Sequence, residues 1–236
     1  MLPPDVQPAH LYDSAITVYS PDGRIYQVEY AREVVKRGTT VVGVTASDGI
    51  GLLAGRRDGS RLAIQDSVEK IFQIDDHIAC ASCGLVADAR ALVSTARLIA
   101  ARHKFVYGAP IEVEGLTRDL SDMMHSFTQS GGARPYGVSL LIGGLNERSR
   151  LYETDPSGAF VGYKASAVGN RRSEVMEKLE AAYRPDLTLD DAVPLAYKAL
   201  MEAREVGDQG AVEGATITAD GYRRLTTDEI AALAGT

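Results

Sequence analysis

The run Gly38-Thr39-Thr40-Val41-Val42-Gly43-Val44 determines the architecture predicted for this 236-residue chain. It is rich in β-branched residues, and a second apolar run over residues 49–55 follows the polar break at Ser47-Asp48. Two such runs joined by a short polar break predict a hairpin of antiparallel strands. Residues 71–74 and 77–83 repeat the pattern and predict a second hairpin.

Apolar residues spaced three and four apart predict helices before and between the strands. The first covers residues 24–36 and stops at Gly38, and the clearest one runs from 84 to about 104. In a later helix over 189–203, Thr188 and Asp191 predict a capping box. Pro194 should kink that helix or delay its start. The other predicted elements are helices over 112–129 and 175–183, strands over 137–144, 150–154, 163–168, 214–218 and 221–225, and a short last helix capped by Thr226 and Glu229.

The order of these elements indicates the fold class. After an N-terminal helical extension, the chain reads strands, two helices, strands, two helices and strands. Paired strands with tight turns imply antiparallel sheets, and paired helices imply helical layers. An α+β fold with four α-β-β-α layers fits this order, although propensity alone does not separate it from other α+β folds.

Composition excludes two classes of partner. The net charge is −7 and the pI is about 5.2, which argues against nucleic acid, because binding nucleic acid needs a basic surface. No stretch approaches the roughly 18 uninterrupted apolar residues of a membrane span, so no membrane is expected. The first residues lack the basic and apolar segments of a signal peptide, and a cytoplasmic location is therefore the default expectation.

Cys80 and Cys83 form a CxxC pair, which could be a redox pair or half of a zinc site. Two thiolates need two further ligands, and the sequence has no second CxxC and no paired histidines. Residues three apart on a strand face opposite sides, so we interpret both as buried structural cysteines. The glycines around Gly51 continue a strand and open no helix, and there is no P-loop. No metal and no cofactor are expected.

Thr39 opens an apolar strand, which is the position of the nucleophile in hydrolases that use an N-terminal threonine. In such enzymes the free α-amine of the threonine activates its own hydroxyl. Here a peptide bond to Gly38 occupies that amine, and 38 residues precede Thr39. The preceding segment is therefore the part of the chain whose role needs an explanation.

The segment Tyr12-Asp13-Ser14-Ala15-Ile16-Thr17-Val18-Tyr19-Ser20-Pro21-Asp22-Gly23-Arg24-Ile25-Tyr26-Gln27-Val28-Glu29-Tyr30-Ala31 closely resembles the N-terminal signature of proteasome α subunits. The likeness continues through 67–71, 82–90, 134–139 and 154–158, and it covers the chain from Tyr12 to about Ile230. The chain most resembles the single-type α subunits of archaea. The resemblance implies a single proteasome-type domain over 1–236, with a gate-forming tail over 1–22, an N-terminal helix over 23–37 and an αββα sandwich over 38–236.

The resemblance also implies partners. Seven copies of the chain would form a homo-heptameric α ring, which stacks on a ring of proteasome β subunits that hold the proteolytic sites. An ATPase activator of the proteasome-activating nucleotidase type would dock through its C-terminal tails. Unfolded protein substrates would pass through the ring, so the chain would admit substrate for ATP-dependent degradation rather than cleave it.

Catalysis can be tested residue by residue against the family's active β subunits. They need a terminal threonine, an acidic residue after the second strand and a lysine before the third. Alignment on Val42-Gly43 places Thr39 at the nucleophile position, and the acidic position falls on Gly55. With the segment Phe72-Gln73-Ile74-Asp75 as the anchor, the lysine position falls on Lys70. Glycine cannot orient a lysine, so a non-catalytic subunit of a threonine endopeptidase complex is expected. The alternative is a β-type threonine protease subunit, produced by cleavage before Thr39.

The resemblance assigns site residues as well. Lys70, Gly84 and Leu85 match the pocket for an activator tail, where a compact ammonium suits a terminal carboxylate. Glu29, beside the turn of Pro21, belongs to the same site and could transmit docking to that turn. The residues that match the family's open-state cluster are Tyr12, Asp13, Pro21 and Tyr30.

Simpler interpretations stay open. Without the family match, Lys70 would be read as an exposed lysine at a strand end. The cluster around Tyr12 could only shape the tail in one closed state. The chain as a whole could be a plain scaffold that nucleates ring assembly without a regulated gate.

Overall fold

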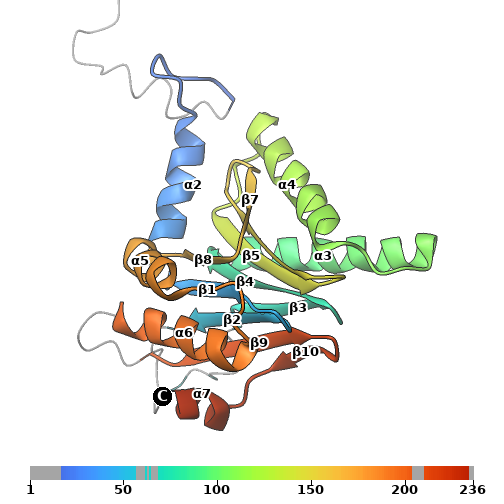
Figure 1. Cartoon of the computed structure of the whole chain (residues 1–236). Helices are drawn as coiled ribbons and strands as arrows, with labels where there is room; N and C mark the ends of the chain where they lie inside the picture. Colours follow the sequence, from blue (N-terminus) through green and yellow to red (C-terminus); the bar gives the residue numbers. More distant parts are fainter. Residues whose placement is uncertain (1–16, 57–61, 63, 65–68, 204–209, 234–236) are drawn as a thin grey trace, which may run out of the picture.

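Two five-stranded antiparallel sheets lie face to face between layers of helices (Figure 1). The computed structural model describes residues 17–56, 62, 64, 69–203 and 210–233. The first sheet has the order β10 (Gly221–Arg224), β9 (Val212–Thr218), β2 (Ile50–Gly55), β1 (Val41–Thr45) and β8 (Ala165–Val168). The second sheet has the order β3 (Ile71–Asp75), β4 (Ile78–Gly84), β5 (Val138–Leu145), β6 (Ser149–Thr154) and β7 (Phe160–Tyr163).

Helices cover the outer face of each sheet (Figure 1). The first sheet carries α5 (Arg172–Ala182) and α6 (Leu189–Glu202), and the second carries α3 (Val86–Tyr107) and α4 (Val113–Gln129). One buried apolar cluster lies between each helix pair and its sheet, and a third lies between the two sheets. The predicted α+β fold with α-β-β-α layers is therefore confirmed. Within the described ranges, no helix is both long enough and apolar enough to cross a membrane.

Both predicted hairpins form, and the faces of β4 agree with the interpretation of the cysteines. β1 pairs antiparallel with β2, and β3 pairs antiparallel with β4. Cys80 belongs to the cluster beneath α3 and α4, whereas Cys83 belongs to the cluster between the sheets. Burial raises the pKa of Cys80 to about 12 and that of Cys83 to about 11. Both thiols are therefore protonated near neutral pH and chemically inert.

The start of α6 differs from the prediction. The side chain of Thr188 makes no capping bond, so the expected box with Asp191 does not form. Instead Asp48, from the turn between β1 and β2, accepts a 2.9 Å hydrogen bond from the Leu189 N–H. The helix continues through Pro194, and the proline therefore does not delay its start.

The end of the described chain agrees better with the sequence. α7 (Thr227–Leu233) begins with the predicted capping box, in which the Thr226 N–H and the Glu229 side chain are 2.7 Å apart. The return bond from the Glu229 N–H to the Thr226 hydroxyl measures 3.2 Å. The sequence analysis did not predict β7, a short edge strand that contains Gly162.

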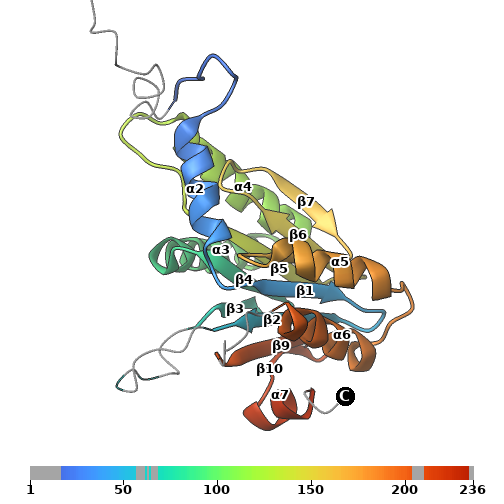
Figure 2. The same cartoon turned by 90° about the vertical axis from the view of Figure 1, so that its left-hand side faces the viewer.

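The N-terminal helix α2 (Tyr26–Lys36) stands at one end of the sandwich and extends away from the sheets (Figures 1 and 2). Val28, Ala31 and Val35 form its buried stripe, which packs against β4 and β5. Arg32 anchors the helix, because its guanidinium donates two hydrogen bonds of 2.9 Å to the carboxylate of Asp155. Such a two-point charged contact fixes the orientation of α2 as well as its position.

Candidate functional site

Thr39 and Lys70 meet at the end of the sandwich where α2 leads into β1. Lys70, the residue before β3, donates from Nζ to the hydroxyl and to the carbonyl of Thr39, both at 2.6 Å. The same Nζ lies 3.3 Å from the carbonyl oxygen of Gly55, the last residue of β2. The structure thus brings together the three residues that the alignment placed at catalytic positions.

The chemistry of this group differs from that of a threonine nucleophile. Gly55 contributes only a backbone carbonyl, so no carboxylate at this position orients Lys70. The amine of Thr39 is part of the peptide bond to Gly38, whose N–H donates to the Val35 carbonyl at 2.9 Å. The Gly38 carbonyl accepts a 2.9 Å bond from the N–H of Asn170. Both backbone polar groups of Gly38, its N–H and its carbonyl, are therefore hydrogen-bonded within the folded chain.

Asn170 and Thr40 belong to this site, and sequence reasoning missed both. The Thr40 hydroxyl lies 3.0 Å from the side-chain oxygen of Asn170 and accepts a 3.1 Å bond from the Arg171 N–H. Gly169 lets the two segments approach, since a Cβ there would lie 2.9 Å from the Gly38 carbonyl oxygen. The pair Gly169-Asn170 directly after β8 was the only signal in the sequence.

Glu213 is a further site residue that sequence reasoning missed. It lies on β9 with only 5% of its surface exposed. Its Oε1 accepts hydrogen bonds from the backbone N–H groups of Lys70, at 2.5 Å, and Ile71, at 3.0 Å. Arg224 donates to the other carboxylate oxygen at 3.0 Å and to Glu69 at 3.1 Å. A single acid within an otherwise apolar strand was the available signal, because a buried carboxylate needs partners.

Gly84 and Leu85 lie at the same end of the molecule. A Cβ on Gly38 would lie 3.2 Å from the Gly84 nitrogen, so the two glycine backbones are in close contact. Leu85 precedes α3, donates its N–H to the Gly137 carbonyl at 2.9 Å and is 41% exposed. Gly84 therefore lies against the segment that leads into Thr39, and the pocket for an activator tail stays a prediction.

Replacing Gly84 with alanine is expected to lower the free energy of unfolding by about 3 kcal/mol. Gly84 has φ +127°, and a Cβ would lie 2.2 Å from the carbonyl oxygen of Gly137. Gly108 is a matched control, since its φ is +66° but no atom would lie within 4 Å of its Cβ. The alanine variant there should lose only about 1 kcal/mol. Urea unfolding compares the two, and equal losses would contradict the close approach at Gly84.

Glu29 is separated from Lys70 in the single chain. It lies near the start of α2, and Lys36 follows it by roughly 10 Å along the helix axis. Its carboxylate accepts a 2.7 Å hydrogen bond from Arg32, the residue that also binds Asp155. Burial alone would raise the pKa of Asp155, but the hydrogen bonds from Arg32 and Ser157 hold it below its usual value. Within one chain Glu29 therefore belongs to a charged group on α2, and its part in the pocket for an activator tail stays a prediction.

The predicted open-state cluster is only partly described. Pro21 lies in the turn closed by the bond from the Gly23 N–H to the Ser20 carbonyl, at 2.8 Å. Tyr30 is exposed on α2 and stacks on Tyr26, with ring centroids 6.4 Å apart. Tyr12 and Asp13 lie outside the described residues.

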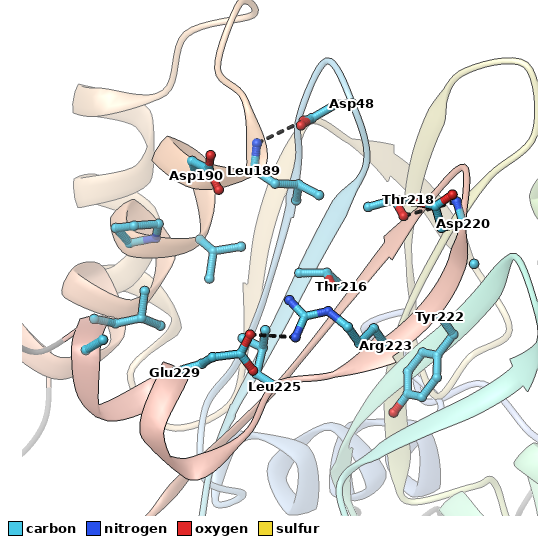
Figure 3. Close-up of a pocket in the computed structure, with 15 residues that line it drawn as sticks. Asp48, Leu189, Asp190, Thr216, Thr218, Asp220, Tyr222, Arg223, Leu225 and Glu229 are labelled. Carbon is cyan, nitrogen blue, oxygen red and sulfur yellow. Dashed lines mark hydrogen bonds and ion pairs between the residues drawn. The ribbon is translucent and has the colours of Figure 1, made fainter.

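A cavity of about 710 Å³ opens elsewhere, between α6, α7 and the strands β9 and β10 (Figure 3). Its walls combine the apolar Leu189 and Leu225 with an ion pair of 2.6 Å between Arg223 and Glu229. None of the described residues that the sequence analysis assigned to a site lines this cavity. It is thus separate from the Thr39–Lys70 region.

Comparison with known proteins gives concordant matches along the chain. Residues 35–217 match the proteasome subunit family, and residues 12–33 match the N-terminal signature of A-type proteasome subunits. "Proteasome subunit alpha" of Methanocaldococcus jannaschii is 54% identical over 84% of this chain and 76% of its own length. The protein of the same name from Methanothermobacter thermautotrophicus is 52% identical, over 93% of this chain and 90% of its own. "Proteasome subunit alpha" of Pyrococcus abyssi is 49% identical, over 95% of this chain and 87% of its own length.

Proposed function

Because this chain belongs to the proteasome α subunit family, we propose that it forms the outer heptameric rings of a proteasome core particle and gates the entry of protein substrates. In this proposal the chain itself is non-catalytic, and β subunits carry out the proteolysis. Its N-terminal residues 1–22 close the pore. An ATPase activator of the proteasome-activating nucleotidase type opens the pore when its C-terminal tails dock at Lys70.

The observation that carries the proposal is the changed chemistry around Thr39. Lys70 lies 2.6 Å from the Thr39 hydroxyl, yet Gly55 supplies no carboxylate and Gly38 blocks the amine. A nucleophile of this kind needs a base that accepts its proton and a group that orients the base. Lys70 is half-buried, with its ammonium at Thr39, and a compact ammonium suits an incoming terminal carboxylate.

The retained contact between Thr39 and Lys70 also favours the alternative of a threonine protease formed by cleavage before Thr39. The two functions predict different masses and different peptidase activities for the purified chain. We expect the purified chain to keep its full mass of 25.3 kDa on prolonged incubation and to hydrolyse no peptide, because the Gly38–Thr39 bond stays intact. Intact-mass spectrometry and N-terminal sequencing measure this. A new N-terminus at Thr39, with peptide hydrolysis that Thr39→Ala removes, would favour the protease instead.

The surface of α3 supports assembly with other subunits. Leu98 and Phe105 lie two turns apart on one face of this helix and are 69% and 90% exposed, and Tyr107 at its end is 71% exposed. Apolar side chains clustered on a surface mark sites of protein contact. In the proposed particle, neighbouring copies of this chain and the β subunits cover such surfaces.

A further inference from the structure

We infer that Glu213 is a positioning residue for Lys70 and that Arg224 holds Glu213 in place. Together they would determine how well the site binds a terminal carboxylate. This inference rests on the proposed docking of activator tails at Lys70. Neither Glu213 nor Arg224 has to touch the tail for this role.

The contacts of Glu213 join the two sheets at the position of Lys70. Glu213 belongs to β9 of the first sheet, whereas Ile71 begins β3 of the second and Lys70 directly precedes it. One carboxylate oxygen accepts both of their N–H groups, at 2.5 and 3.0 Å. On the other side, the Lys70 carbonyl accepts a 2.8 Å bond from the Ser82 N–H. Both peptide groups of Lys70 are thus fixed, and its side chain reaches Thr39 from this anchored backbone.

Arg224 offsets the free-energy cost of burying the Glu213 carboxylate. An ionised carboxylate that is 5% exposed requires hydrogen bonds and a compensating charge. Arg224 supplies the charge at 3.0 Å and reaches Glu69, the residue before Lys70, at 3.1 Å. The guanidinium therefore fixes the carboxylate of Glu213 and the segment that enters β3 at the same time.

Fixing the backbone matters because lysine is a flexible side chain. Its four-carbon stem gives the ammonium many conformations, and binding a carboxylate has to select one of them. An anchored backbone reduces the conformational entropy lost on binding. Glutamine at position 213 would keep an acceptor oxygen for the N–H groups of Lys70 and Ile71, but its NH2 group would face the donor groups of Arg224. The side chain would then no longer be held by Arg224, and the local strand would relax.

The experiment uses particles assembled from this chain and β subunits. A synthetic peptide with the C-terminal sequence of the ATPase activator is prepared as the free acid and as the C-terminal amide. The ratio of the two dissociation constants measures recognition of the terminal carboxylate. We expect wild-type particles to prefer the free acid by about tenfold, as for a charged hydrogen bond, and Lys70→Ala to remove the preference.

Glu213→Gln and Arg224→Gln should each reduce this preference to about threefold or less. The direction in which Glu213→Gln changes the preference for the free acid distinguishes a positioning role from a simple charge effect. Removing a negative charge near Lys70 would by Coulomb's law alone strengthen the binding of a carboxylate. A weaker preference therefore reports lost positioning. Arg224 is 44% exposed in its side chain, so its variant tests the inference even if the buried Glu213 variant does not assemble.

Arg223→Gln is the matched control. Arg223 precedes Arg224 on β10 but pairs with Glu229 at 2.6 Å, and its variant should keep the full preference. An unchanged or larger preference in Glu213→Gln and Arg224→Gln would overturn the inference, while the loss in Lys70→Ala would still uphold docking at Lys70. A preference that survives Lys70→Ala would instead overturn the proposed docking, and this inference with it.

Discussion

Particles that carry Lys70→Ala should lose the stimulation of protein degradation by the ATPase activator, while their rings assemble as in the wild type. Two 2.6 Å bonds to Thr39 fix the position of the Lys70 ammonium. A charged hydrogen bond to a tail carboxylate contributes about 1.5–3 kcal/mol, so its loss weakens each docked tail by roughly ten- to a hundredfold. Several tails dock on one ring, and the total effect should approach complete loss.

Degradation of an unfolded fluorescent substrate, with and without activator and ATP, measures this effect. Native mass spectrometry establishes that the variant rings contain the same number of subunits. Lys36→Ala is a suitable control, because Lys36 is an exposed lysine of α2 that pairs with Glu33 at 2.6 Å. Its variant removes the same charge from a side chain that pairs with Glu33 and not with Thr39, and it should leave stimulation intact. Full stimulation of the Lys70 variant would show that activation does not depend on this ammonium.

Much of the fold could be predicted because its signals are local. The run after Gly38 is followed by a second apolar run, and the resulting hairpin of β1 and β2 forms as expected. The geometry of a single strand sufficed to place Cys80 and Cys83 in different cores. The capping box at Thr226 likewise depends on residues three apart.

The wrong or missing predictions concern contacts between distant segments. The cap at Leu189 comes from Asp48, which is 141 residues away in the sequence. Glu213 lies 143 residues from Lys70, and no periodicity in β9 indicates that its carboxylate would cross to the other sheet. Asn170 was missed for the same reason, because its N–H donates to the carbonyl of Gly38, which lies in a distant segment of the sequence. The sequence therefore located Thr39, Gly55 and Lys70 through a family pattern, but not the residues that support them.

The second large effect concerns the N-terminal segment. Residues 1–10 contain Pro3, Pro4 and Pro8, which donate no backbone hydrogen bonds and do not continue a helix. In the proposed particle this segment, which lies outside the described residues, would close the pore of the ring. If the open state of the pore is populated at most about 10% of the time, removing the segment should raise the rate of substrate entry without activator on the order of tenfold.

Deletion of residues 2–12 is the sharpest test of whether this chain gates entry to a particle whose proteolysis resides elsewhere. The measurement is the rate at which assembled particles hydrolyse an unfolded protein without activator, alongside the rate for a short peptide. We predict a rise of about tenfold for the protein and a smaller rise for the peptide, with no further stimulation by the ATPase. An unchanged basal rate for the protein, in particles of normal mass, would contradict the gate and favour a plain scaffold.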